Sequence, residues 1–366
     1  MPTTTEDYMR IALALARKGW GETSPNPMVG AVLVKNGRII SQGWHHKDGA
    51  PHAEIECLRA AEESPEGAEM YVTLEPCSTH GRTGACCDAI AKAKIAKVYI
   101  GATDPNPVHA GRAKQVLQNY GIDCETGILA DECENLNFIF NTSIVSQSAV
   151  IAIKYAISAD DKISETRTRP TKITGDDARK NLMMWRRLFK SIAVGRKTLE
   201  ADNPRLTARI EETETSPIRL VFDSTLSIAE YNIKKYSLFS DNFADKTRIV
   251  CGIDASVERL NKLKKSGINV MQIQEKSRTP EFWQILKKQL FNERINSLLI
   301  EGGAEIIRNV VATKSADFAF EYRNPLLTLG ETAYPLWEKQ RPYDFDSAQE
   351  FKLGNDTLTF GKISYR

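Results

Sequence analysis

HAEIECLRAAEESPEGAEMYVTLEPCSTHGRTGAC, residues 52–86, is the stretch that decides how the first part of this chain folds. It predicts a helix that opens on His52 and Glu54, a strand over residues 70–74, and a loop from Cys77 back to Cys86 at the start of a second helix. One imidazole and two thiolates are three protein ligands for zinc, which leaves the fourth tetrahedral position to water. Three ligands plus water indicate a catalytic rather than a structural site.

Glu54 indicates what such a site does. Zinc lowers the pKa of bound water to about 7, and deamination also needs protons delivered to a ring nitrogen and to the departing ammonia. At the first turn of a helix, His52 and Glu54 can both reach the space in front of the helix end, although residues two apart in mid-helix diverge by about 200°. We therefore predict that His52, Cys77 and Cys86 bind Zn²⁺ and that Glu54 carries the proton.

The spacing of the two cysteines differs from that of the zinc deaminase signature, H-x-E followed by P-C-x-x-C. Here eight residues separate Cys77 from Cys86. Cys87 is a rival to Cys86, but as the next residue of a helix it would point about 100° away. His80 is the nearest candidate for a fourth protein ligand, and its coordination would make the site structural.

Composition argues against several classes of protein. The 366 residues contain 49 Lys and Arg against 47 Asp and Glu, a formal net charge of +2, so no strong field attracts nucleic acid or a membrane surface. A nucleic-acid base deaminase is expected to have the P-C-x-x-C motif and a basic, aromatic-rich surface, and this sequence shows neither. The N-terminus lacks a signal-peptide pattern, no apolar run approaches the length of a membrane span, and seven cysteines in so long a chain fit a reducing compartment. We expect a soluble, cytoplasmic protein.

The first 148 residues alternate strand and helix signals. Apolar residues recur at helical spacing over residues 6–18, and Asn36-Gly37 between two β-branched runs is typical of a hairpin with a type I′ turn. Strands over 70–74 and 97–103 alternate with helices near 85–94 and 109–120, and one helix over about 131–146 closes the unit. This alternation predicts a three-layer α/β domain.

The residues from 149 onward predict a second α/β domain. Strands with buried character are expected over residues 150–158, 191–195, 218–223, 248–252 and 295–303. Helical segments over 176–189, 255–265 and 279–290 separate most of them, which indicates a mostly parallel sheet.

Two segments of this second domain suggest that it handles phosphate and nucleotide. Glu301 ends a strand before Gly302-Gly303 and a helix, where free backbone N–H groups suit a phosphate, although a tight turn explains the glycines as well. Polar residues that follow another strand end fit a phosphorylated ligand or a solvated loop. They are Thr198, Asp202, Arg205 and Arg209.

Several motifs of the first half resemble those of one enzyme family. They are YMRIALALARKGWGETSPNPMVGAVLV at residues 8–34, HAE at 52–54, TLEPCSTHGRTGAC at 73–86 and GATDPNP at 101–107. Together they resemble the bifunctional deaminase/reductase family of riboflavin biosynthesis, in which a long spacer between the two cysteines is typical. The resemblance implies a cytidine-deaminase-like domain with Asn26 and His45 beside the pyrimidine, whereas the sequence alone fits Asn26 equally well as a turn residue. Thr79 and Gly84-Ala85 replace the family's His and Pro-Pro.

The second half resembles the reductase half of the same family, with its motifs in the same order: KYAISADDK, ITGDDAR, VGRKTLEADNPRLTAR, EGGAEI and NPLLTLG. The resemblance implies a dihydrofolate-reductase-like α/β domain that binds NADPH. The cofactor contacts that it implies are Ala156, Thr198, Asp202, Ser224 and Gly303. The substrate contacts that it implies are Arg186, Leu206, Arg209 and Glu301, with the arginines on the ribose phosphate.

This half also departs from the family pattern. Asp161 stands where the family has Gly, Met183 stands where His is common, and Pro170 and Lys172 replace a polar substrate contact and an aromatic cofactor contact. Without an aromatic side chain to stack on the cofactor, NADPH binding would weaken by about 1 to 3 kcal/mol, the contribution that aromatic side chains make when they stack on nucleic-acid bases. Lys172 would compensate by meeting a phosphate of the cofactor.

We therefore predict a zinc-dependent pyrimidine deaminase domain over residues 1–148 and an NADPH-dependent reductase domain over 149–366. The first would deaminate 2,5-diamino-6-(5-phosphoribosylamino)pyrimidin-4(3H)-one. The second would reduce the ribosyl side chain of 5-amino-6-(5-phosphoribosylamino)uracil to ribityl. The alternative is a monofunctional deaminase with a vestigial reductase domain. We expect a phosphoribosyl pyrimidine as the ligand, a homo-oligomer (dimer or tetramer), and neither nucleic acid nor membrane as a partner.

Overall fold

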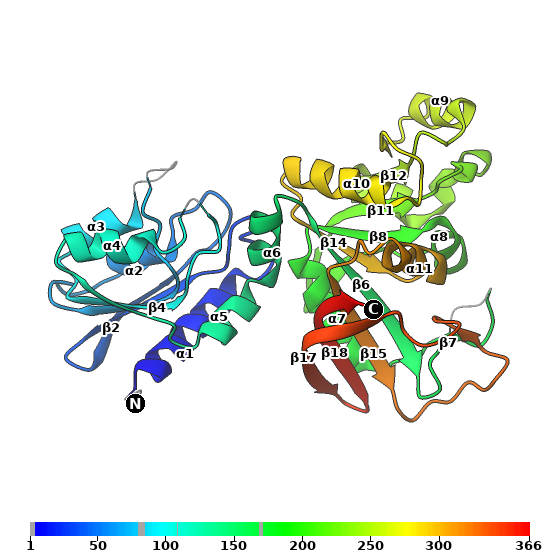
Figure 1. Ribbon diagram of the computed structural model, residues 1–366. Helices are drawn as coiled ribbons and strands as arrows, with labels where there is room; N and C mark the ends of the chain where they lie inside the picture. The colour runs from blue at the N-terminus through cyan, green and yellow to red at the C-terminus, as the bar shows by residue number, and fades with distance from the viewer. Residues whose placement is uncertain (1–3, 80–84, 108, 168–170) are drawn as a thin grey trace. The chain divides into compact units, whose positions relative to one another are not determined.

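The computed structural model describes residues 4–79, 85–107, 109–167 and 171–366. The chain divides into two compact units, Met1–Gln147 and Ser148–Arg366 (Figure 1). Each unit has its own sheet and its own buried core. No helix within the described ranges is both long enough and apolar enough to span a bilayer.

The first unit contains a five-stranded sheet in the order β2-β1-β3-β4-β5. Its strands are β1 (Gly30–Lys35), β2 (Arg38–Trp44), β3 (Glu69–Leu74), β4 (Lys97–Ala102) and β5 (Asp123–Thr126). β1 is antiparallel to β2 and β3, whereas β3, β4 and β5 are parallel. The turn between β1 and β2 has φ of 51° at Asn36 and 71° at Gly37, the left-handed pair that a type I′ turn requires.

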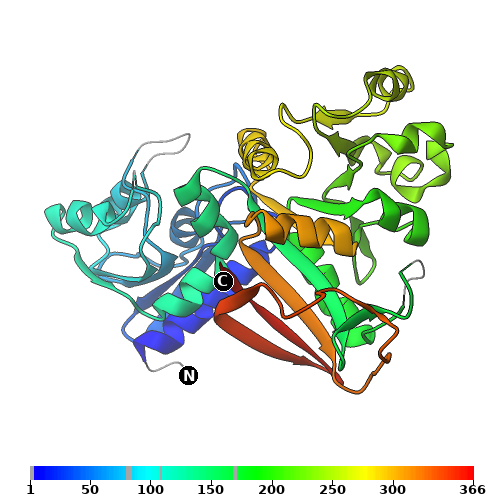
Figure 2. The same ribbon diagram turned by 45° about the vertical axis from the view of Figure 1, so that its right-hand side comes forward.

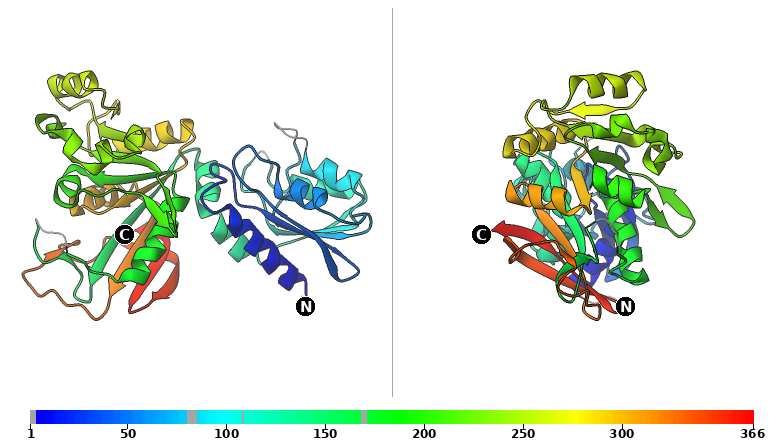
Figure 3. Two further views of the ribbon diagram at one scale, coloured as in Figure 1. Left: turned by 180° about the vertical axis from the view of Figure 1, so that it is seen from behind. Right: turned by 90° about the vertical axis from the view of Figure 1, so that its right-hand side faces the viewer.

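Helices cover both faces of this sheet, as the three-layer prediction requires. α2 (Ala53–Arg59), α3 (Cys86–Lys92) and α4 (Arg112–Asn119) lie on one face, and α1 (Thr5–Ala16) and α5 (Ala130–Leu136) lie on the other (Figure 3). Glycines allow the closest approaches: a Cβ at Gly30 would lie 2.0 Å from the Ala12 carbonyl oxygen of α1. A Cβ at Gly43 would lie 2.4 Å from the Cys57 nitrogen of α2. The short helix that carries His52 and Glu54 therefore packs directly on β2.

The prediction of one helix over 131–146 is wrong, because the chain forms two helices there. α5 ends at Leu136 and α6 (Phe138–Ser146) begins after Asn137, whose φ of −110° is not helical. The Asn137 side chain accepts a hydrogen bond from the Met28 nitrogen at 2.8 Å and donates one to the Met28 carbonyl oxygen at 2.9 Å. This buried amide ties the helix pair to the segment before β1, a contact that local helical spacing cannot reveal.

The second unit is built on a nine-stranded sheet in the order β13-β12-β11-β8-β14-β6-β15-β18-β17 (Figure 2). Every neighbouring pair from β13 to β15 is parallel, and the last two pairs are antiparallel. The strands are β6 (Val150–Ser158), β8 (Ser191–Gly195), β11 (Ile218–Phe222), β12 (Thr247–Cys251), β13 (Val270–Gln272), β14 (Ser297–Glu301), β15 (Phe318–Asn324), β17 (Tyr343–Leu353) and β18 (Asp356–Tyr365). Two small two-stranded sheets pair β7 (Lys162–Ser164) with β16 (Tyr334–Pro335) and β9 (Ala208–Ile210) with β10 (Thr213–Thr215).

Two apolar clusters lie on opposite faces of this large sheet, because successive strand residues point to opposite sides. Ala193 of β8 belongs to the cluster beneath α10 (Pro280–Asn292) and α11 (Ala304–Ala312). Ile192 and Val194 belong to the cluster that contains side chains of α8 (Arg196–Asp202) and α9 (Val257–Lys265). Helix α7 (Asp176–Leu188) packs against β17 and β18. This sheet holds the carboxyl ends of β6, β8, β11 and β14 at one edge.

Candidate active sites

His52, Cys77 and Cys86 come together in the first unit. His52 is the N-cap residue of α2, Cys77 follows the end of β3, and Cys86 is the first residue of α3. Their ligand atoms all lie within 4.8 Å of one another. The His52 Nδ1 atom is 3.2 Å from the Cys86 Sγ and 3.6 Å from the Cys77 Sγ. One nitrogen and two sulfur donors at such distances fit a zinc ion with an open fourth position.

The protein holds the Cys77 sulfur in a form suited to a cation. The Cys86 backbone nitrogen donates a hydrogen bond to the Cys77 Sγ at 3.2 Å. A hydrogen bond from the Cys86 side chain, together with the neighbouring His52, lowers the pKa of the Cys77 thiol to about 4. Since metal-bound cysteine is a thiolate, this environment favours the binding form.

Glu54 lies in the first turn of α2 and its side chain is buried. Burial raises the pKa of its carboxyl group, an effect that the nearby His52 opposes. The Cys86 side chain also acts against this rise in the pKa of Glu54. The protonated form of this carboxyl group is not disfavoured by burial. Because the group also lies beside the candidate metal ligands, it is suited to accepting and releasing a proton.

The rival ligands are distinguished by position. Cys87 is buried and directs its sulfur toward the Pro76 carbonyl oxygen, 3.8 Å away, rather than into the metal cluster. His80 and Gly84 lie outside the described residues. Within those residues, the group of potential metal ligands at this site is His52, Cys77 and Cys86.

His45 borders the metal cluster, whereas Asn26 takes part in a turn. The His45 ring lies edge-on to the His52 ring with centroids 5.8 Å apart. Its Nδ1 lies 2.9 Å from the Pro51 carbonyl oxygen, and its buried Nε2 meets no hydrogen-bond partner among the described residues. Burial lowers the pKa of this imidazole, so the neutral ring can donate from Nδ1 and offer Nε2 as an acceptor. The Asn26 nitrogen bonds to the Thr23 carbonyl oxygen, and its side-chain amide donates to Asp48 at 3.1 Å.

Sequence reasoning assigned no role to Glu75, which organises the loop beside the metal cluster. Its buried carboxylate accepts hydrogen bonds from two backbone nitrogens of the loop after β4, Asp104 at 3.0 Å and Gly111 at 2.9 Å, and from Ala113 in the first turn of α4 at 2.8 Å. The same loop brings the His109 Nδ1 to 3.4 Å from the Thr79 Oγ1. The signal in the sequence was an acidic residue placed directly after a buried strand, before Pro-Cys.

We predict that Glu75→Gln raises the KM of the deaminase about tenfold, because one carboxylate hydrogen bond to a backbone N–H contributes about 1.5 to 3 kcal/mol. The glutamine amide nitrogen cannot accept a hydrogen bond, so at least one of these backbone N–H groups loses its partner. Steady-state ammonia release should show the change in KM, with zinc content unaffected. Glu69→Gln, at the start of the same strand, is the matched control. An unchanged KM for Glu75→Gln would contradict a positioning role.

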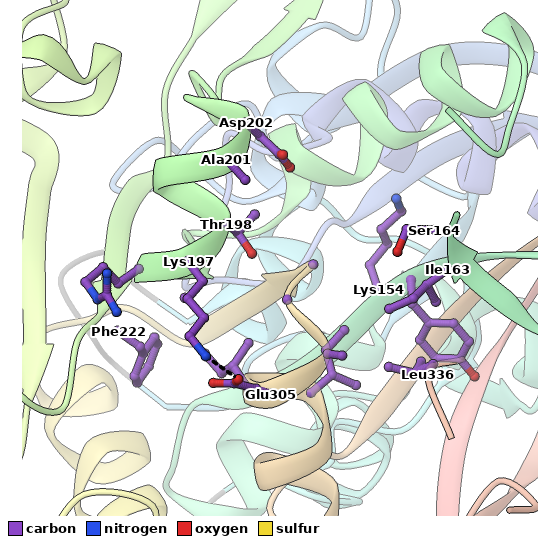
Figure 4. A pocket seen from close by; sticks show the side chains of 18 of the residues that line it. Lys154, Ile163, Ser164, Lys197, Thr198, Ala201, Asp202, Phe222, Glu305 and Leu336 are labelled. Atoms are coloured by element: carbon purple, nitrogen blue, oxygen red, sulfur yellow. Dashed lines mark hydrogen bonds and ion pairs between the residues drawn. The ribbon is translucent and has the colours of Figure 1, made fainter. Parts of the chain in front are cut away.

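A large cavity of about 1250 Å³ lies at the carboxyl ends of β6, β8, β11 and β14 (Figure 4). Open α/β sheets bind their ligands at such ends. In Figure 4, Lys154 and Ser164 lie on one wall and Thr198 and Asp202 of α8 on the other. All five residues predicted to contact the cofactor line this cavity: Ala156, Thr198, Asp202, Ser224 and Gly303.

The glycine pair after β14 lets the backbone approach this cavity. Gly302 and Gly303 have φ of 73° and 78°, a left-handed conformation that side chains disfavour. A Cβ at Gly303 would lie 2.8 Å from the Thr198 Oγ1. The turn therefore brings β14 and α8 into close contact at the cavity wall, where a nucleotide phosphate can meet backbone N–H groups.

Three of the predicted substrate residues, Arg186, Arg209 and Glu301, belong to one cluster of hydrogen bonds. Arg186 and Glu301 make a bidentate ion pair, with both N–O distances 2.7 Å, and both side chains are nearly buried. Arg186 also donates to the Thr207 carbonyl oxygen, whereas Arg209 donates to the Thr207 hydroxyl and is more exposed. Leu206 is buried at a left-handed φ of 54°. None of Arg186, Leu206, Arg209 and Glu301 is among the described residues that line the cavity.

Lys154 connects this cluster with the cavity, and sequence reasoning gave it no role. It lines the cavity, and its Nζ lies 5.3 Å from the centre of the Tyr322 ring. Burial lowers the pKa of the Lys154 ammonium, an effect that the Glu301 carboxylate opposes and Arg186 reinforces. A lysine inside the apolar strand VIAIKYAIS was the signal, because a lysine is rarely placed in a protein core unless its charge is paired.

The departures from the family pattern have local explanations where they are described. Asp161 adopts a left-handed φ of 61° and forms an ion pair with Arg323 at 2.7 Å. Lys172 lines the cavity and forms an exposed ion pair with Asp176 at 3.4 Å. Met183 is buried within α7, and Pro170 lies outside the described residues.

Comparison with known proteins agrees with this division of the chain. Residues 2–102 match the family model of the cytidine and deoxycytidylate deaminase zinc-binding region, and residues 149–358 match that of the RibD C-terminal domain. The riboflavin biosynthesis protein RibD of Actinobacillus pleuropneumoniae is 34% identical over 97% of this chain and 93% of its own length. That of Bacillus amyloliquefaciens is 35% identical over 90% of this chain and 87% of its own length.

Solved structures of two related proteins are similar over nearly the whole chain. Acinetobacter baumannii RibD, form 1, is 28% identical with a TM-score of 0.82, covering 98% of each chain. A deaminase/reductase from Thermotoga maritima is 28% identical with a TM-score of 0.79, covering 99% of this chain and 98% of that one.

The folds and sites thus define a two-domain enzyme, a zinc-dependent deaminase joined to an NADPH-dependent reductase with a dihydrofolate-reductase-like fold. Because the match extends over nearly the whole chain, the vestigial-reductase alternative is not favoured. The chain belongs to the RibD family, the bifunctional deaminases and reductases of riboflavin biosynthesis.

Proposed function

We propose that His52, Cys77 and Cys86 hold the zinc of the deaminase and that Glu54 moves its protons. The observation that supports this most directly is the three-donor cluster with a buried carboxyl group beside it. When bound, zinc supplies a water whose pKa is lowered to about 7. Beside such a site, the Glu54 carboxyl group would hold the proton that the ring nitrogen of the pyrimidine and the departing ammonia need. The His45 Nε2 accepts a hydrogen bond from an N–H group of the pyrimidine. Together with Asn26 it orients the ring.

In the second unit, we propose that Lys154 supplies the proton that the reduction consumes. When bound, NADPH would supply a hydride to C1 of the ring-opened ribosyl chain, and one proton from the protein would complete the ribityl product, leaving NADP⁺. Ala156, Thr198, Asp202, Ser224 and Gly303 bind NADPH. The Arg186–Glu301 pair acts electrostatically on Lys154, and the more exposed Arg209 meets the substrate phosphate.

The proposed zinc ligands can be tested by metal analysis of the purified full-length enzyme. We expect about one zinc ion per chain in the unmodified protein, since one three-ligand site is assigned. Cys77→Ala should lose the metal and ammonia release but keep NADPH-dependent reduction of the aminouracil. Cys87→Ala is the control, because its sulfur points away from the cluster. Full zinc content in Cys77→Ala, or its loss in Cys87→Ala, would contradict the assignment.

The ligand of the deaminase is a small molecule, as its family implies. A homo-oligomeric state, either dimer or tetramer, and a cytoplasmic location stay predictions.

A further inference from the structure

One end of the reductase cavity carries an arginine that no part of the mechanism above uses. Ser224 follows the end of β11, and Arg278 lies in the loop between β13 and α10. Both residues line the cavity, and the Arg278 Nη2 lies 3.5 Å from the Ser224 Oγ. A hydroxyl and a guanidinium from two different loops therefore meet at the same end of the cavity.

The Arg278 guanidinium has no carboxylate within ion-pair distance among the described residues. Its neighbours on the cavity wall differ, because Arg196 is paired with Glu200 and Lys197 with Glu305. The side chain of Arg278 is exposed rather than packed. Arg278 acts electrostatically on Glu305, but Glu305 forms its ion pairs with Lys197 and Arg167, so the Arg278 guanidinium can still bind an anionic ligand that enters the cavity.

The backbone holds Arg278 in an unusual conformation. Its φ is 72°, in the left-handed region that non-glycine residues rarely adopt and that is enriched at functional sites. Asn309 of α11 donates a hydrogen bond to the Arg278 carbonyl oxygen at 2.9 Å. The preceding Ser277 donates its backbone N–H to Asp254 at 2.8 Å and accepts from the Gly252 nitrogen at 2.9 Å. These contacts hold the loop against the end of β12. They therefore fix the position of the Arg278 backbone, from which the guanidinium extends.

The acidic residue at this strand end, Asp223, lines the cavity, but its carboxylate oxygens are engaged by neighbouring protein groups. In many dinucleotide sites an acidic residue near a strand end accepts hydrogen bonds from the ribose 2′-hydroxyl and so favours NADH, whereas an arginine accommodates the 2′-phosphate of NADPH. Here Asp223 is buried and accepts from the Ile228 nitrogen at 2.9 Å and the Thr225 hydroxyl at 3.2 Å. Arg196 faces the same carboxylate at 3.8 Å. The carboxylate is therefore satisfied within the protein and its charge is countered.

We propose that Arg278 and Ser224 form the subsite for the 2′-phosphate of NADPH, and that Arg278 determines the preference for NADPH over NADH. A planar guanidinium can bind two phosphate oxygens at once, and the Ser224 hydroxyl can donate to a third. The proposal rests on the use of NADPH by this domain. It adds the residue that recognises the 2′-phosphate, the group that distinguishes NADPH from NADH.

The test compares two nucleotide fragments on the zinc-loaded full-length enzyme. Binding of 2′,5′-ADP and of 5′-ADP is measured by isothermal titration calorimetry for the unmodified protein and for Arg278→Gln. We expect Arg278→Gln to weaken 2′,5′-ADP binding about 10- to 100-fold, the range for a lost charged hydrogen bond, and to leave 5′-ADP binding unchanged. In reductase assays the KM for NADPH should rise in the same proportion, with kcat and the KM for NADH unchanged. Lys276→Gln, an exposed charge in the same loop that does not line the cavity, is the control.

Two results would overturn the proposal in different ways. If Arg278→Gln keeps the unmodified preference for 2′,5′-ADP, or weakens both fragments equally, Arg278 does not recognise the 2′-phosphate although the cavity still binds the cofactor. If the unmodified enzyme binds neither fragment and oxidises no NADPH, the assignment of the cavity to the cofactor fails, and this subsite fails with it.

Discussion

Glu54→Gln is expected to reduce ammonia release from the diaminopyrimidinone about 10²- to 10⁴-fold, the contribution of a positioned general acid and base. Glutamine keeps the size of the side chain but cannot accept or release a proton at neutral pH. His52, Cys77 and Cys86 remain, so zinc content should be unchanged. The reductase half, assayed separately with the aminouracil and NADPH, should keep its full rate because its cavity lies in the other unit.

Glu56→Gln gives this experiment a matched control on the same helix. Glu56 lies two residues further along α2, and its carboxylate approaches Arg59 at 3.6 Å and His46 at 3.8 Å rather than the metal donors. The same chemical change there should leave ammonia release within about fivefold of the unmodified enzyme, as surface pairs contribute at most about 1 kcal/mol. A Glu54→Gln enzyme with more than a tenth of the normal rate would show that another group moves the proton.

The deaminase cluster was accessible to sequence reasoning because its residues belong to short, regular elements. The H-x-E pair lies at a helix start and each cysteine lies next to an element boundary, so local patterns were sufficient to predict their convergence. The fold class was likewise predictable, since strands and helices alternate in both halves. That alternation places helices on both faces of each sheet. The roles of individual residues stay predictions.

The remainder depends on contacts between distant segments, which no local pattern contains. Asn137 interrupts a helix by bonding to Met28, more than a hundred positions earlier. Glu75 meets a loop and the first turn of α4, 29 to 38 positions later, and Arg278 meets Ser224 across 54 positions. The C-terminal hairpin of β17 and β18 was also not anticipated, because most of β17 is exposed at the sheet edge and lacks a clear alternation of apolar residues.

Lys154→Met is expected to reduce the kcat of the reductase about 10²- to 10⁴-fold, since it removes the proposed general acid while keeping a chain of similar length. Binding of NADPH should change little, because the proposed cofactor contacts lie elsewhere on the cavity wall. Lys352→Met, on the exposed edge strand β17 outside the cavity, should retain the normal rate. Fluorescence titration with NADPH and single-turnover oxidation of NADPH would separate binding from the chemical step.

The pH dependence of kcat gives this prediction a signature that a purely structural role for Lys154 would not produce. The protonated ammonium is the active form, and burial lowers its pKa below the ordinary value of 10.5. The rate should therefore be highest at lower pH and fall as the pH rises through this lowered pKa, because the donor loses its proton before an exposed lysine would. In Lys154→Met the residual rate should lack this alkaline fall. If the variant keeps the same fall, or keeps more than a tenth of the normal rate, the proton comes from another group, and Lys154 contributes only its charge beside Glu301.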